Sequence, residues 1–145
     1  ADARWRLFAF ADAAPPDEET SLLAALGRFL ETDPASPIRR HTPQGADPDS
    51  VIDCRAVLQQ GFRETDISSL PPLFRPAKGR LGLTDYEKTF CPDLKNGPDL
   101  YDLRDINREE GCIVIVRPDQ YVAEILPLNG FDELSAFFDR ILLPA

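Results

Sequence analysis

A continuous apolar run, Cys112–Val116, most limits how this chain can fold. It contains no charged side chain, which is typical of a central strand covered on both faces. A second strand-like segment, residues 121–126, follows after four residues in which Pro118 and Asp119 favour a turn. The sequence therefore predicts a β-hairpin whose first strand lies inside a sheet.

Residue spacing predicts two further strands and two helices. Trp5–Phe10 is short and aromatic-rich, and residues 51–58 resume a strand pattern after a proline-rich loop over residues 32–50. Leucine and phenylalanine recur at helical spacing over residues 18–31 and 131–142, and each segment has acidic residues near its start. The apolar stripe of the last helix consists of Phe131, Leu134, Phe138, Ile141 and Leu142.

Residues 61–111 are the least regular part of the chain, because prolines and glycines interrupt them every few residues. Short helical turns are predicted over residues 85–90 and 99–106, and loops elsewhere. The segment is too apolar for a free linker, so some of its side chains are expected to pack against another domain or subunit. These side chains are Phe62, Ile67, Leu70, Leu73, Phe74, Leu81, Leu83, Tyr86 and Phe90.

The order of these elements is strand, helix, strand, irregular segment, hairpin and helix. It predicts an α/β protein with a thioredoxin-like fold, in which helices cover both faces of a small mixed sheet and residues 61–111 form a long irregular insertion. A chain of 145 residues with 43% hydrophobic residues can bury a core of ordinary size. We therefore expect a single domain, residues 1–145.

Charge and hydropathy limit the partners. The formal net charge of −9 argues against nucleic acid and against an anionic membrane surface, because both favour clustered lysine and arginine. No apolar stretch approaches the roughly 18 residues that span a bilayer, and no secretory signal pattern opens the chain. A cytoplasmic protein is expected. The absence of methionine, even at position 1, suggests a processed or excised piece.

The three cysteines, Cys54, Cys91 and Cys112, are too widely spaced for a disulfide framework or a paired metal site. A redox thioredoxin needs a Cys-x-x-Cys pair, and the sequence has none. Cys54 and Cys112 lie in strand patterns, where buried thiols are expected. Cys91, in a predicted loop, is the best candidate for a reactive thiol, if neighbours such as Lys88 or Lys95 acidify it.

Other candidate residues favour structural interpretations. His41, the single histidine, lies in the proline-rich loop and is expected to be solvated rather than to bind metal or join a catalytic triad. Residues 79–82 lack the spacing of a phosphate-binding loop and predict a chain bend. Arg117 and Asp119 lie in the hairpin turn, whose geometry explains both. Phe137 lies slightly off the apolar stripe and is the aromatic residue expected at an interface.

Several stretches resemble the C-terminal domain of the phenol hydroxylases and related FAD-dependent aromatic monooxygenases. Residues 111–123 resemble the closing hairpin of that domain, and residues 4–12 resemble its first strand. Residues 49–53 and 55–57 resemble its second strand, and residues 85–88 a stretch further on. The resemblance thus spans nearly the whole chain.

The resemblance implies a parent enzyme with an FAD-binding domain, a substrate domain and this thioredoxin-like domain, which lacks redox cysteines and contributes to dimer contacts. Enzymes of this family use NADPH to reduce FAD, and O₂ then forms a flavin hydroperoxide that hydroxylates a phenolic ring. The family residues that bind FAD, NADPH and substrate precede this region. The resemblance therefore assigns no catalytic, cofactor-binding or metal-binding residue to the chain, and its implied partners are the parent's other domains and a second copy in a homodimer.

Two other functions remain open at this level. The chain could be a free-standing, redox-inactive thioredoxin-like module that binds other proteins. It could also be a redox enzyme that uses Cys91 alone.

Overall fold

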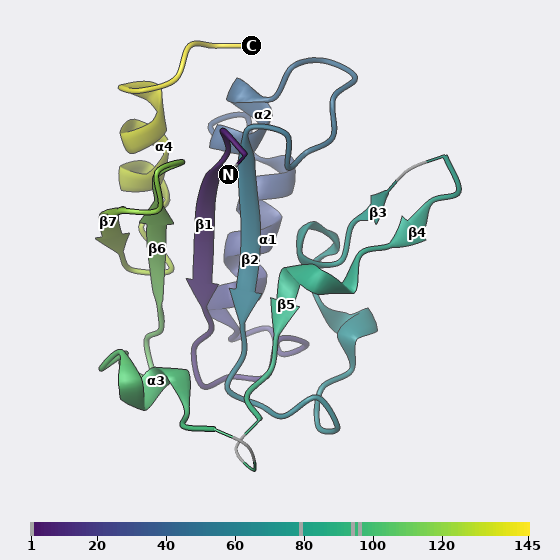
Figure 1. Ribbon diagram of the computed structural model, residues 1–145, viewed down its shortest axis with the longest axis vertical. Helices are drawn as coiled ribbons and strands as arrows, with labels where there is room; N and C mark the ends of the chain where they lie inside the picture. Colours follow the sequence, from purple (N-terminus) through teal and green to yellow (C-terminus); the bar gives the residue numbers. More distant parts are fainter. Residues whose placement is uncertain (1, 79, 94, 96) are drawn as a thin grey trace.

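The computed structural model of the protein describes residues 2–78, 80–93, 95 and 97–145. Its centre is a five-stranded mixed sheet in the order β5-β2-β1-β6-β7 (Figure 1). β1 pairs in parallel with β2 and antiparallel with β6, and β6 and β7 form the predicted hairpin. This topology confirms the thioredoxin-like α/β fold. The strands of this sheet are β1 (Trp5–Phe10), β2 (Ile52–Val57), β5 (Thr89–Phe90), β6 (Cys112–Val116) and β7 (Val122–Leu126).

Both predicted helices are present, with different limits. α1 (Leu22–Thr32) starts after a turn, because Asp12 accepts hydrogen bonds from the N–H groups of Leu22 and Leu23 and Ser21 accepts one from Ala24. These bonds satisfy N–H groups that have no partner inside the helix. α4 (Phe131–Asp139) ends three residues earlier than predicted. None of the helices described is long and apolar enough to cross a membrane.

α1 and α4 lie on the same side of the sheet (Figure 1). Alternate strand residues such as Leu7 and Ile113 are fully buried in one cluster with Leu26 of α1 and Phe138 of α4, whereas their neighbours Phe8 and Val114 are half-buried. The one-turn α3 (Leu100–Leu103) reaches the opposite face at its end, where Tyr101 packs on Phe10. This differs from the expectation of helices on both faces, because prolines and glycines divide residues 58–111 into short pieces.

The segment between β2 and β6 contains several short elements. η3 (Tyr86–Lys88) confirms the predicted helical turn in part, but Thr89 and Phe90 join the sheet as β5. β3 (Ala77–Lys78) and β4 (Leu83–Thr84) pair with each other and extend away from the main sheet as an arm (Figure 1). The remaining short helices are η1 (Ile67–Ser69) and η2 (Pro72–Phe74).

Two predictions about the C-terminal helix are wrong in detail. Phe137 is only 8% exposed, and its ring packs edge-on against Trp5 and Phe138, at centroid distances of 5.7 and 5.2 Å. Ile141 is exposed because the helix ends before it. Phe137 is therefore a core residue of this chain, because the ring of Trp5 packs against it.

Candidate interaction surface

The face of the sheet turned away from α1 and α4 is the main candidate for a functional surface, and we call it the open face. Residues directly opposite each other in neighbouring strands point to the same side. The registers Phe8–Val114 and Val114–Ile125 therefore place these side chains together. The same registers assign the following residues to the open face: Arg6, Phe8, Phe10, Asp53, Arg55, Val57, Phe90, Cys112, Val114, Val116, Val122 and Ile125.

Apolar side chains are most exposed along the outer strand β7 of this face. Val122 is 59% exposed and Ile125 is 61% exposed, and Tyr121 beside them is 70% exposed. Apolar residues gathered on one surface mark a site of protein interaction more often than scattered ones do. The prediction that Cys112–Val116 is covered on both faces therefore holds for one face only within this chain.

The end of the open face around Arg6 is charged but not basic, because Arg6 lies 3.2 Å from the exposed Asp2. Arg6 and Arg55 are partly exposed there, whereas Asp53 is fully buried and accepts hydrogen bonds from Arg55 at 3.0 and 3.1 Å. The Arg55 guanidinium also lies 6.0 Å from the centre of the Phe90 ring. Asp53 is thus the one acidic residue that the registers assign to the open face, and it is buried, whereas the exposed Asp2 lies against Arg6 at the edge.

A buried group of ion pairs lies beside this end of the sheet. Lys88, which is 4% exposed, contacts Asp53 and lies 2.9 Å from Asp49. Lys78 also contacts Asp49 and lies 3.2 Å from Asp85. Burial alone would raise the pKa of Asp49, but the hydrogen bonds from Lys78 and Lys88 outweigh it and lower the pKa to about 2. These charges hold β2, β3 and η3 together and leave neither lysine free as a base.

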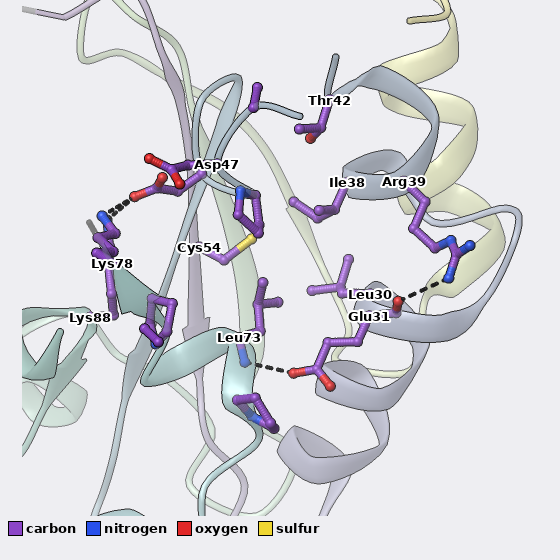
Figure 2. Close-up of a pocket in the computed structure, with 16 residues that line it drawn as sticks. Leu30, Glu31, Ile38, Arg39, Thr42, Asp47, Cys54, Leu73, Lys78 and Lys88 are labelled. Carbon is purple, nitrogen blue, oxygen red and sulfur yellow. Dashed lines mark hydrogen bonds and ion pairs between the residues drawn. The ribbon is translucent and has the colours of Figure 1, made fainter. Parts of the chain in front are cut away.

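A cavity of about 500 Å³ lies between α1, the short helix α2 (Pro37–His41) and the base of the arm (Figure 2). Its volume is in the range of small-molecule sites. Apolar side chains such as Leu30 and Ile38 line it, and its floor contains Cys54, whose pKa is raised by burial. Lys78 and Lys88 at one side are held by carboxylates, so neither ammonium group is available as a base or a nucleophile.

The prediction of a solvated His41 is wrong. Its side chain is 1% exposed and lies at the end of α2, inside the segment predicted as a loop. Nδ1 lies 2.9 Å from the carbonyl oxygen of Leu143, and Nε2 lies 3.1 Å from Asp139. His41 therefore joins α2 to the end of α4, and its two ring nitrogens both have protein partners.

The two remaining turn motifs have local roles. Arg117 and Asp119 form an ion pair of 2.5 Å within the β6–β7 turn. This agrees with the prediction that the two residues have a structural role in the turn. Gly82 has a φ of +62° in the bend of the arm, a backbone conformation that favours glycine. Gly79, which belongs to the same predicted bend, lies outside the described residues.

The structure does not provide the acidic thiol that a redox role for Cys91 requires. Cys91 is half-buried, and burial raises its pKa, although a hydrogen bond with Thr65 opposes the rise. The ammonium group of Lys88 is occupied by Asp49 and Asp53 rather than by the thiol. Among the described residues, neither Lys88 nor Lys95 contributes to the pKa of Cys91, so its thiol lacks the positive neighbour that stabilises a thiolate.

We expect the native chain to react slowly with a disulfide reagent at about pH 7, because its three free thiols are buried or half-buried and none has a lowered pKa. All three thiols should react once the chain is unfolded in urea. The Cys91→Ser variant identifies the contribution of that residue to the native rate. Native labelling of Cys91 at the rate of free cysteine would contradict the expectation and restore the redox hypothesis.

The chain is similar to known proteins over its whole length. A family model of the phenol hydroxylase C-terminal dimerisation domain matches residues 1–145. The chain is 52% identical over 143 residues to 3-hydroxybenzoate 4-monooxygenase of Comamonas testosteroni. The aligned region covers 98% of this chain and 22% of the relative. It is 34% identical over 144 residues to the FAD-dependent monooxygenase terD of Aspergillus terreus. This second aligned region covers 97% of the chain and 23% of the relative.

A more distant relative, phenol 2-monooxygenase fsqG of Aspergillus fumigatus, is 28% identical over 143 residues, which cover 97% of this chain and 22% of the relative. The chain thus spans less than a quarter of the length of each of these relatives. The family match extends over all the elements that form the sheet and its open face. The chain belongs to the family of phenol hydroxylase C-terminal dimerisation domains.

Proposed function

We propose that this chain is the non-catalytic dimerisation domain of an FAD-dependent monooxygenase that hydroxylates a phenolic ring. The observation that carries the proposal is the open face, where no helix among the described residues covers the apolar residues of β6 and β7. A surface of this kind is stabilised when a second protein surface excludes water from it. The names of the relatives, two monooxygenases and a phenol 2-monooxygenase among them, support the class of reaction.

In this proposal FAD, NADPH and the phenolic substrate bind to the FAD-binding and substrate domains of the parent protein. The turn between β1 and α1 supports the assignment, because residues 11–21 contain no glycine. Asp12 and Ser21 already accept hydrogen bonds from the first N–H groups of α1. A pyrophosphate needs a glycine-rich turn and free N–H groups at such a helix start. The chain then contributes no catalytic, cofactor-binding or metal-binding residue.

Residues 1–145 form one domain in the same proposal. Support comes from the core cluster, which contains Leu7 near the start of the chain and Phe138 near its end. The N–H of Ala145 also donates a hydrogen bond of 2.9 Å to the carbonyl of Arg40. We place the parent protein in the cytoplasm, which suits three cysteines that form no disulfide.

The solution mass of the isolated chain tests the proposal. We expect light scattering after size exclusion to give a mass that rises toward twice 16.2 kDa as the concentration increases, because the open face of one copy covers that of another. A mass that stays at 16.2 kDa up to millimolar concentration would contradict dimerisation by this domain. It would instead favour packing of the open face against the other domains of the parent.

A further inference from the structure

The single histidine of the chain, His41, lies where α2 meets the end of α4 and residues 143–145, which we call the end segment. Its side chain is 1% exposed. Nδ1 lies 2.9 Å from the carbonyl oxygen of Leu143, and Nε2 lies 3.1 Å from Oδ1 of Asp139. Both partners are hydrogen-bond acceptors, whereas a neutral imidazole has only one N–H group. Only the imidazolium ring can therefore donate both hydrogen bonds.

The charges around the ring favour the imidazolium form through one carboxylate. Asp139 is the carboxylate within ion-pair distance of the ring among the described residues. Burial of the ring opposes its charge, and so does the guanidinium of Arg40, which lies 2.7 Å from Asp139. Because Arg40 is 42% exposed, water and salt screen its charge. Arg39 donates a hydrogen bond of 3.4 Å to the carbonyl oxygen of Glu31. The other charged residues of α1, α4 and the C-cap of α4 form no ion pair in the part of the chain that the structure describes: Arg28, Glu31, Asp132, Glu133 and Arg140.

The end segment has few other contacts. Leu143 is 87% exposed, so burial contributes little to its position. Within the described residues, two hydrogen bonds tie the segment to α2. One joins His41 to the carbonyl of Leu143, and the other, of 2.9 Å, runs from the N–H of Ala145 to the carbonyl of Arg40. A segment with so few contacts is ordered only where such bonds hold it.

Loss of one proton from the ring breaks one of its two bonds in particular. The bond from Nε2 to the carboxylate of Asp139 is charge-assisted and stronger than a bond to a neutral carbonyl group. The remaining proton therefore stays on Nε2. The lone pair of Nδ1 then faces the carbonyl oxygen of Leu143, and the two acceptors repel each other. The neutral ring thus keeps α4 joined to α2 but no longer holds the end segment.

We propose that His41 is a pH-sensitive latch for the end segment. The imidazolium ring holds the segment against α2, and release of the Nδ1 proton to water as the pH rises frees the segment. Histidine is the side chain that changes charge between about pH 5 and pH 8. The latch thus contributes stability at low pH that is lost as the pH rises. It does not depend on the proposed function, because His41 and the end segment lie outside the open face.

Nuclear magnetic resonance of the full chain tests the latch, because one histidine gives one pair of ring ¹⁵N signals. We expect both ring nitrogens to carry protons at about pH 6 and only Nε2 to carry one at about pH 9. The backbone order parameter of Leu143, from ¹³C relaxation, should fall from about 0.85 to below about 0.6 with the same midpoint as the ring. The order parameters of the β6–β7 hairpin should not change.

Two substitutions of His41 separate its two bonds. Asparagine places an amide N–H group near the position of Nδ1, and glutamine places one near the position of Nε2. His41→Asn keeps a donor for Leu143 without a group that titrates, so the end segment should stay ordered at both pH values. His41→Gln keeps a donor for Asp139 only, so the segment should be mobile at both. Far-UV circular dichroism at each pH checks that the variants are folded.

The charge of Asp139 gives a further pair of variants. Asp139→Asn removes the carboxylate that favours the imidazolium ring, so the ring titration and the release of the end segment should move together to lower pH. Asp132→Asn makes the same change in the first turn of α4 and should move neither.

The native chain alone can overturn the proposal, even if a variant fails to fold. An end segment that stays ordered while the ring loses its proton contradicts the latch. So does a ring that is neutral at about pH 6 beside an ordered segment, or one that keeps both protons at about pH 9. A native pH response in His41→Asn or His41→Gln assigns the effect to another group and also overturns the proposal. A chain that remains monomeric contradicts the proposed function but leaves the latch intact.

Discussion

Replacement of Lys88 by methionine is expected to lower the free energy of unfolding by about 3 kcal/mol. The substitution keeps the length and the apolar part of the side chain but removes the ammonium group that lies between Asp49 and Asp53. Both carboxylates are buried or nearly buried, and only part of the lost interaction is replaced by Arg55. Urea unfolding followed by circular dichroism at about pH 7 measures the effect.

Lys78→Met is the matched control for this variant. Lys78 shares Asp49 as a partner, but its side chain is 33% exposed and its ammonium can be replaced in part by water. We expect a loss of about 1 kcal/mol or less. Equal losses in the two variants would mean that burial of the lysine does not decide the energy of this group of ion pairs.

The pH dependence of the Lys88→Met effect follows from Asp49, whose folded pKa of about 2 lies below the ordinary value of 3.8. A lowered pKa contributes stability that is complete above about pH 4 and is lost as the pH falls toward 2. The difference in unfolding free energy between the native chain and Lys88→Met should therefore shrink as the pH falls from about 4 toward 2. A difference that stays constant over this range would contradict the assigned role of Asp49.

The Gly111→Ala variant is expected to lose about 3 kcal/mol or more, from two sources. Gly111 has a φ of +60°, which costs a residue with a Cβ about 1 to 2 kcal/mol. A Cβ there would also lie 2.2 Å from the carbonyl oxygen of Phe10 and 2.7 Å from a methyl group of Leu128, so backbone of the central strands must move. Thermal and urea unfolding measure the loss.

Gly45→Ala separates the two sources. Gly45 also has a positive φ, +80°, but no atom lies within 4 Å of a Cβ placed there. We expect a loss of about 1 kcal/mol, from the backbone conformation alone. If the two alanine variants lost the same free energy, the close approach between Gly111 and β1 would have no energetic weight.

Local patterns predict β1, β2, the β6–β7 hairpin and the two long helices because each depends on residues close in sequence. The continuous apolar run Cys112–Val116 and the stripe through Leu134 and Phe138 describe elements that need no distant information. The limits of the helices are less well predicted, because Asp12, ten residues away, caps the start of α1. Pro37, the first residue of α2, was the one local signal for that helix inside the predicted loop.

The candidate interaction surface depends on long-range contacts and could be predicted only in part. The sequence indicates excess apolar area in residues 61–111, and the structure covers Leu70 and Phe74 there but leaves Leu81 and Leu83 exposed. Most of the open face comes from the strands, not from that segment. Periodicity cannot show that a second face lacks a helix, because coverage depends on where distant segments pack.

The sequence by itself determined the fold class, the lack of a redox cysteine pair and the family resemblance, since each depends on the order and spacing of residues along the chain. Only the tertiary structure decided that His41 and Phe137 are buried, that Lys88 joins two carboxylates, and that one face of the sheet stays open. These features arise from residues as far as 102 positions apart that meet after folding. The physical reason is that burial and charge pairing are properties of the packed neighbours of a side chain and not of its neighbours in sequence.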